Sequence, residues 1–178
     1  MIDAYLALGS NLGDRLSALS TAVELLAREP AFLLRRVSRA WETEPLGPPQ
    51  PRYLNAVAQV GTLLSARATL QKLLAIEEGM GRVRRERWAA RDIDLDLLSF
   101  GGRLVSEKGL TVPHPRLHER AFVLAPLREL APLWVHPVSG KSVEELWGEL
   151  PEALRLGVRP LRPIPRNFDE PGDEDGRA

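Results

Sequence analysis

The sequence predicts an α+β fold in which helices cover one face of an antiparallel sheet. Two spacings of apolar residues alternate along its first hundred positions. One recurs at every second residue, as in a half-buried strand, and the other at every third or fourth, as on one face of a helix. They follow each other in the order β-α-β-β-α-β. With 44% of its 178 residues hydrophobic, the chain can form one domain with its own core.

The first strand, over residues 5–8, ends in the turn GSNLGD. A helix is expected over residues 14–28, with Asn11 or Asp14 as its cap. Its apolar face consists of Leu16, Leu19, Val23 and Leu26. A strand over residues 32–43 then leads into a proline-rich loop.

The next strand is expected over residues 53–64, with Leu54, Ala56, Ala58 and Val60 on one side. Ser65 is expected to cap a second helix, which carries Leu70, Leu73, Leu74 and Glu77 and ends near Gly79. The segment RDIDLDLLSF follows as the last strand. This order predicts a ferredoxin-like β-α-β-β-α-β core, with both helices on one face of the sheet and the other face free for a site.

The C-terminal part adds helices and a tail. Residues 110–132 are interpreted as a loop leading into a helix, and residues 143–150 as a short helix. From Pro160 the chain is rich in proline and acidic residues, which is typical of flexible segments. We therefore expect a single domain over residues 1–159 and a flexible tail over residues 160–178.

Composition argues against several classes of protein. Basic and acidic residues balance at 24 each, which disfavours a general affinity for nucleic acid or membranes. The absence of cysteine excludes disulfides and thiolate metal sites and fits a reducing compartment. The N-terminus lacks the pattern of a signal peptide, and no run reaches the roughly 20 apolar residues of a membrane span. We expect a cytoplasmic protein that is a monomer or a weak homodimer.

Three carboxylates alternate with apolar residues in RDIDLDLLSF, although aspartate is disfavoured in strands. On a strand, Asp94 and Asp96 would point the same way, about 6.5 Å apart. Carboxylate oxygens suit Mg²⁺, which commonly takes its other ligands from water and substrate phosphates. The alternative is an ordinary solvated strand face, but three uncompensated acids would repel one another there.

Two further segments suggest ligands. Five arginines surround Trp88 just before the acidic strand, namely Arg82, Arg84, Arg85, Arg87 and Arg91. Guanidinium groups bind phosphate oxygens bidentately, although the same run could form a solvated loop or ion pairs with the acids. In PRYLN, Tyr53 and Asn55 share a strand face, where a ring and an amide suit a flat heterocycle. The alternative is an edge-strand tyrosine and a turn asparagine.

Three other motifs are less specific. SGKS at residues 139–142 lacks the earlier glycine of a P-loop, because Val135 stands there. His114 and His118 have the spacing of a helical zinc pair, but prolines on both sides of His114 disfavour a helix. GSNLGD fits a tight strand-to-helix turn better than a phosphate cradle.

Taken together, these segments resemble the hydroxymethyldihydropterin pyrophosphokinases of folate biosynthesis. The resemblance runs over residues 4–131 through YLALGSNLGDR, PLGPPQPRYLNAV, IEEGMGRVRRERWAARDIDLDLL and LTVPHPRLHERAFVLAPL. It implies the fold described above. It also implies transfer of pyrophosphate from ATP to the hydroxymethyl group of 6-hydroxymethyl-7,8-dihydropterin, by attack at the β-phosphorus and with release of AMP.

The resemblance also implies roles for particular residues. Asp94 and Asp96 would bind two Mg²⁺ ions that bridge the ATP phosphates, and Arg82 and Arg91 would be catalytic residues on those phosphates. Other residues would help to bind ATP: Glu77, Arg84, Trp88, His114 and Arg120. The pterin would stack between Tyr53 and Phe122 and bond to Asn55 and to groups near Thr43 and Leu46.

Some positions and readings stay open. Leu74, Gly109 and Pro115 differ from the residues of some family members, and Asp92 is interpreted as an ion-pair partner outside the metal pair. No general base is evident. The alternatives are a two-metal nucleotidyltransferase on the same fold, which would also need paired aspartates, and an RNA-binding sheet, which would need exposed aromatics and a basic face.

Overall fold

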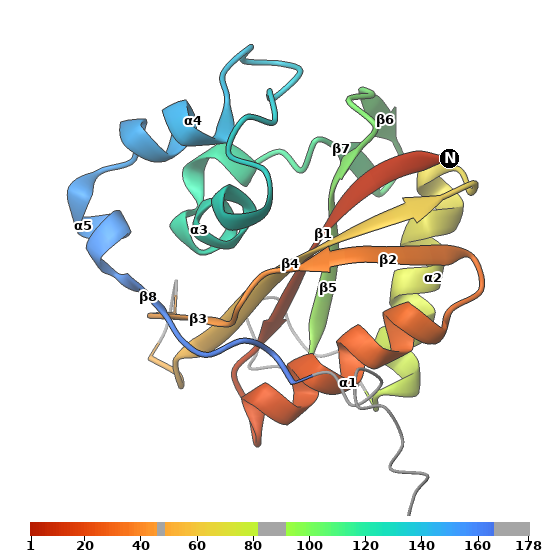
Figure 1. Ribbon diagram of the computed structural model, residues 1–178, viewed down its shortest axis with the longest axis horizontal. Helices are drawn as coiled ribbons and strands as arrows, with labels where there is room; N and C mark the ends of the chain where they lie inside the picture. The colour runs from red at the N-terminus through yellow and green to blue at the C-terminus, as the bar shows by residue number, and fades with distance from the viewer. Residues whose placement is uncertain (46–48, 82–91, 166–178) are drawn as a thin grey trace, which may run out of the picture.

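The computed structural model describes residues 1–45, 49–81 and 92–165, whose main sheet has six strands (Figure 1). The elements in chain order are β1 (Ile2–Ser10), α1 (Arg15–Arg28), β2 (Phe32–Val37), β3 (Trp41–Thr43), β4 (Tyr53–Thr62), α2 (Ala66–Gly79), β5 (Asp94–Phe100), β6 (Val105–Glu107), β7 (Leu110–Val112), η1 (Leu117–Glu119), α3 (Ala121–Leu130), α4 (Val143–Glu149), α5 (Glu152–Leu156) and β8 (Val158–Pro160).

The strand order of the main sheet confirms the expected core. The strands run β5-β1-β4-β3-β8, β2 also pairs with β4, and each of these pairings is antiparallel. When β2 and β3 are counted as one interrupted strand, this is the ferredoxin-like plan. β6 and β7 form a separate hairpin.

The expected strand over residues 32–43 is in fact two strands. Ser38 interrupts it, because its hydroxyl accepts a hydrogen bond from the Val57 backbone N–H at 3.0 Å. Its own N–H donates to the Val57 carbonyl. Ala40 then turns its backbone toward the C-terminal segment, exchanging hydrogen bonds with residues 161 and 162.

Helices α1 and α2 cover one face of the sheet, as expected (Figure 1). Asp14, rather than Asn11, caps α1 by accepting from the Ser17 N–H, and Ser65 caps α2 by accepting from the Ala68 N–H. Leu73 of α2 is fully buried, whereas Leu74 is 36% exposed. The buried strand positions on this face include Leu6, Leu8, Leu54, Ala56, Ala58, Val60, Leu95 and Leu97.

The opposite face is only partly free, which corrects the expectation of an uncovered face. α3 packs over it and α4 packs on α3, and the two helices form a second apolar cluster with Val57 and Leu98 of the sheet (Figure 1). These strand positions are apolar and would otherwise expose hydrocarbon to water, so they require this cover. The rest of the face, toward the start of β4 and β5, carries polar side chains.

The C-terminal segment packs on the domain beyond the expected boundary. Residues 158–160 form β8, which pairs with β3 (Figure 1). Ile164 is 5% exposed within the helix-side core, and the Ser20 hydroxyl donates to the Pro165 carbonyl at 2.6 Å. The expectation of a flexible tail is therefore wrong for residues 160–165, and the remainder of that tail lies outside the described residues. Among the helices that the structure describes, none is long and apolar enough to cross a membrane.

Candidate active site

Asp94 and Asp96 lie on the same face of β5, opposite to the two helices. Leu95 and Leu97, which alternate with them, are buried in the helix-side core, so the two carboxylates face the other way. Both aspartates are half-buried. Asp92 precedes the strand and is exposed. Of the three acids expected on one strand, two therefore lie on β5 and the third is an exposed residue just before it.

This pair suits a hard cation that brings its own further ligands. Within the described residues, no group of three or more His, Cys, Asp and Glu side chains is arranged to hold a metal ion. A pair of carboxylates is typical of Mg²⁺ sites, in which water molecules and substrate phosphates supply the remaining ligands. The donor set therefore fits the magnesium expected from the sequence.

His114 and Arg120 belong to the same site, because both interact electrostatically with the acids of β5. The pKa of His114 is lowered to about 4 by burial and by the charge of Arg120, against the opposing effect of Asp94. Its imidazole is thus neutral at pH 7. Nδ1 accepts a hydrogen bond from the Arg116 backbone N–H at 3.2 Å, so the neutral ring carries its proton on Nε2 and can donate from there.

Arg120 brings a cation to the acidic pair. Burial lowers the pKa of its guanidinium, whereas the charges of Asp96 and Asp94 raise it. Arginine stays protonated in proteins, so this cation persists. Its Cζ lies 5.5 Å from the centroid of the Phe122 ring, a cation–π distance.

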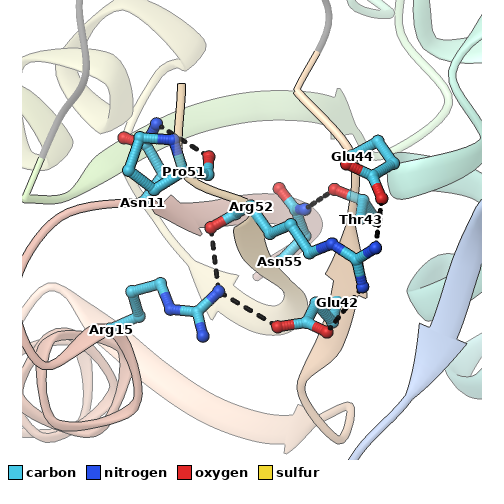
Figure 2. Close-up of polar contacts among 8 residues, drawn as sticks. All are labelled: Asn11, Arg15, Glu42, Thr43, Glu44, Pro51, Arg52 and Asn55. Atoms are coloured by element: carbon cyan, nitrogen blue, oxygen red, sulfur yellow. Dashed lines mark hydrogen bonds and ion pairs between the residues drawn. The ribbon is translucent and has the colours of Figure 1, made fainter. Parts of the chain in front are cut away.

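Asn55 and Thr43 form a buried polar pair on the same face as the acids. The Asn55 Nδ2 donates to the Thr43 Oγ1 at 2.8 Å, and the two residues are 6% and 4% exposed (Figure 2). Gly9 lies in register between Asn55 and Asp94. A Cβ at Gly9 would lie only 3.2 Å from the Asn55 Oδ1. A glycine at this position therefore leaves space for the Asn55 amide.

Tyr53 and Phe122 are the aromatic residues expected beside this pair. Tyr53 shares a face of β4 with Asn55, as predicted, and its hydroxyl donates to the Gln50 Oε1 at 3.4 Å. Phe122 is at the start of α3, which packs against β4 and β3. Both rings are half-buried.

Glu77 has a different environment from the other expected ATP-binding residues. It is 1% exposed on α2, and its Oε1 accepts a hydrogen bond from the Leu95 backbone N–H at 2.6 Å. Because Leu95 separates Asp94 from Asp96, this bond fixes the backbone of β5 between the two acids.

The remaining expectations divide into two groups. Five predicted site residues lie outside the described residues: Leu46, Arg82, Arg84, Trp88 and Arg91. In the SGKS segment, Ser142 caps α4 in a capping box, and Lys141 pairs with Glu149. That segment therefore starts a helix.

A set of charged residues on the helix side of β3 was not expected from the sequence. Arg15 and Arg52 both bond to Glu42, and Asn11 bonds to the Pro51 carbonyl (Figure 2). Asn11 also bonds to Gln50. A pocket of about 450 Å³ lies there, lined by Asn11, Leu12, Gly13, Arg15, Glu42, Pro51 and Arg52. The turn GSNLGD, which contributes Asn11, was the only sign in the sequence.

Comparison with known sequences identifies one family. A family model described as 7,8-dihydro-6-hydroxymethylpterin-pyrophosphokinase (HPPK) matches residues 5–132. A protein of Synechocystis is 43% identical over 143 residues, which is 80% of this chain and 73% of that protein. One of Haemophilus influenzae is 42% identical over 161 residues, 90% of this chain and 100% of that protein. Both are named 2-amino-4-hydroxy-6-hydroxymethyldihydropteridine pyrophosphokinase.

Solved structures agree on the fold. An HPPK–DHPS crystallised with substrates superposes with a TM-score of 0.72 at 14% identity, over 90% of this chain and 48% of that one. Wild-type HPPK–DHPS of Plasmodium falciparum gives a TM-score of 0.67 at 16% identity, over 83% of this chain and 43% of that one. This chain thus spans less than half the length of these two structures, and the likeness concerns the fold alone.

Proposed function

Because this chain belongs to the 7,8-dihydro-6-hydroxymethylpterin-pyrophosphokinase (HPPK) family, we propose that it transfers pyrophosphate from ATP to 6-hydroxymethyl-7,8-dihydropterin by in-line attack at the β-phosphorus. The membership itself makes the chain an ATP-dependent transferase of folate biosynthesis. The proposal adds the mechanism, the two Mg²⁺ ions and the role of each residue.

The observation that carries the proposal is the row Asp94, Gly9 and Asn55, which crosses three adjacent strands in register. Adjacent strands lie about 4.8 Å apart, so the acid and the amide are separated by about 10 Å across a glycine. A flat heterocycle whose polar edge bonds to Asn55 would lie over Gly9 and direct its far end toward Asp94. The hydroxymethyl group of a pterin is at that far end.

Asp94 and Asp96 would hold two Mg²⁺ ions. The chemistry that Mg²⁺ supplies there is neutralisation of phosphate charge and orientation of the triphosphate. Glu77 would keep the two carboxylates in place through the Leu95 N–H. His114 would donate from Nε2 to a phosphate oxygen, and Arg120 would add a fixed positive charge.

The arginines before β5 would complete the phosphate site. We assign Arg82 and Arg91 to the transferred pyrophosphoryl group, with a larger contribution in the transition state than to resting ATP, and Arg84 and Trp88 to the rest of ATP. In phosphoryl transfer, positioning and electrostatic stabilisation account for most of the catalysis. The pterin oxygen would form its bond at the β-phosphorus as the α–β bridge breaks, AMP would leave, and the proton of the hydroxyl group would pass to solvent.

The pterin would be recognised mainly by Asn55. Its Nδ2 already donates to Thr43, so its Oδ1 is oriented to accept from the amino and amide N–H groups of a pterin. Tyr53 and Phe122 would stack on the ring. Backbone groups near Thr43 and Leu46 would supply further bonds. We expect both substrates to be bound by a cytoplasmic monomer or weak homodimer, with no nucleic-acid partner.

Product analysis by ³¹P NMR tests this function. The purified chain is incubated with Mg²⁺, ATP and 6-hydroxymethyl-7,8-dihydropterin. The expected products are AMP in a one-to-one ratio with a pterin that carries two phosphorus signals. ADP with a monophosphorylated pterin would contradict attack at the β-phosphorus. Turnover of ATP at the same rate with and without pterin would favour a nucleotidyltransferase instead.

A further inference from the structure

Glu42 is the centre of an ionic network on the side of β3 that faces α1. Its Oε1 accepts from the Arg15 Nη1 at 3.1 Å and its Oε2 from the Arg52 Nη1 at 3.4 Å (Figure 2). The side chain is 22% exposed. The second terminal nitrogen of Arg52 pairs with Glu44. One guanidinium group thus connects the residue before Thr43 with the residue after it.

Thr43 links this network to the opposite face of the sheet. Side chains alternate along a strand, so Thr43 points away from Glu42 and toward Asn55, whose Nδ2 donates to the Thr43 Oγ1. Figure 2 shows the carboxylate of Glu42 and the Thr43–Asn55 pair together. A backbone held at residues 42 and 44 therefore determines where the Thr43 hydroxyl lies, and the hydroxyl in turn orients the Asn55 amide.

The start of α1 anchors the other end of the β3–β4 connection. Arg15 also donates to the Arg52 carbonyl at 2.9 Å. Asn11, which is 1% exposed, donates from Nδ2 to the Gln50 Oε1 at 3.0 Å and to the Pro51 carbonyl at 3.3 Å. Residues 50–52 immediately precede Tyr53, so both ends of the connection are fastened to the turn GSNLGD and its helix.

We propose that Asn11, Arg15, Glu42 and Arg52 form a positioning network that sets the affinity for pterin without touching either substrate. The identity of the ligand rests on the proposed function, whereas the mechanical link from Arg15 to Asn55 does not. Partly exposed ion pairs contribute little to stability individually. The network therefore acts chiefly by limiting where Thr43 and Asn55 can lie.

Arg15→Ala tests the network, and Arg67→Ala is its matched control. Arg67 lies in the first turn of α2 and bonds to the Glu107 Oε2 at 3.0 Å and to the Lys108 carbonyl at 2.8 Å. Each variant thus loses one carboxylate and one backbone carbonyl contact. The exposed fractions of the two side chains are also similar, at 31% and 36%.

Calorimetry of each variant with 6-hydroxymethyl-7,8-dihydropterin, and separately with a non-hydrolysable ATP analogue, measures the effect. We expect the pterin Kd to rise about tenfold in Arg15→Ala, the change produced by misplacing one hydrogen bond. Affinity for the ATP analogue should change less than about twofold on the same reasoning. Arg67→Ala should change neither. Asn55→Leu removes the amide and should therefore show the largest loss of pterin affinity. The pterin Kd of Arg15→Lys should lie between those of wild type and Arg15→Ala.

Equal pterin affinity in Arg15→Ala and Arg67→Ala would overturn the proposal, as would an equal loss for both ligands in Arg15→Ala. If the unmodified chain binds no pterin, the proposed function fails, and amide hydrogen exchange over residues 41–55 then decides the network alone. Faster exchange in Arg15→Ala than in Arg67→Ala would support the mechanical link. Identical exchange in the two variants would refute it.

Discussion

Asp94 and Asn55 flank Gly9 in register, so a carboxylate and an amide face the same way across three adjacent strands. The two side chains belong to the polar half of a face whose other half is covered by α3. A phosphate-and-metal site and a heterocycle site can therefore be adjacent without competing for the same surface. The first two predictions follow from this row.

The acidic pair should be essential for turnover. Asp94→Ala or Asp96→Ala removes half of the carboxylate ligands, and we expect kcat to fall by at least about 10²-fold because charge neutralisation drives the reaction. Both residues are half-buried on the surface of the sheet, so the fold should persist by circular dichroism. Asp92→Ala is the matched control, since this exposed acid lies outside β5. Near-normal rates in the two strand variants at saturating Mg²⁺ would remove the metal assignment.

Gly9→Ala should weaken pterin binding without unfolding the chain. The added Cβ would lie 3.2 Å from the Asn55 Oδ1, so the amide must move by a few tenths of an ångström. We expect the pterin Kd to rise about threefold to tenfold through this misplacement. Gly148→Ala in α4 is the control, because among the described residues no atom outside the neighbouring backbone of α4 lies within 4 Å of its added Cβ. It should raise the free energy of unfolding by about 0.5–1 kcal/mol. Unchanged pterin affinity in Gly9→Ala would argue against an active role for Asn55.

Ile164→Ala should destabilise the domain, although the sequence assigns this residue to a tail. Ile164 is 5% exposed, and truncating a buried isoleucine typically costs about 2–5 kcal/mol. Leu161→Ala is the control from the same segment, because Leu161 is 41% exposed and should cost less than about 1 kcal/mol. Urea denaturation measures both. Equal midpoints for the two variants would mean that the segment adds little to the core.

The features that were predicted from the sequence are those with local signals. Asp14 and Ser65 cap their helices through hydrogen bonds that span three residues, and the alternation in β4 and β5 shows which side chains share a face. Contacts between distant residues have no such signature. Arg15 and Glu42 are 27 positions apart, and Asn11 and Gln50 are 39 apart.

Two of the corrections to the fold, the burial of Ile164 and the cover over the second face, have the same origin. Ile164 follows a proline-rich stretch with no apolar periodicity. Its burial depends on contacts with the helix-side core, whose residues are distant in the sequence. The packing of α3 on the second face likewise depends on the path that the chain takes from β5 back to β3 and β4. The metal-binding roles of Asp94 and Asp96 and the pterin-binding roles of Asn55 and Tyr53 stay predictions from the sequence, to which the structure adds a common face.

Acidification should lower stability through His114. Burial and the charge of Arg120 lower the pKa of this imidazole from 6.5 to about 4. In the unfolded chain the ring takes up a proton near pH 6.5, whereas in the folded chain it stays neutral until the pH approaches 4. The unfolded state therefore binds more protons between these values, and the free energy of unfolding decreases as the pH falls through that window.

His114→Gln should flatten this dependence. Burial and His118 also lower the pKa of His136, which contributes in the same direction but is unchanged by the substitution. The difference between the two proteins therefore isolates His114. Solvent that reaches the half-buried ring reduces the effect. We therefore expect the free energy of unfolding of wild type to decrease by about 1–2 kcal/mol more than that of His114→Gln between pH 7 and pH 4. Urea denaturation at several pH values measures both slopes. Parallel curves would mean that His114 takes up its proton at the same pH in the folded and unfolded chains, so that folding would not lower its pKa.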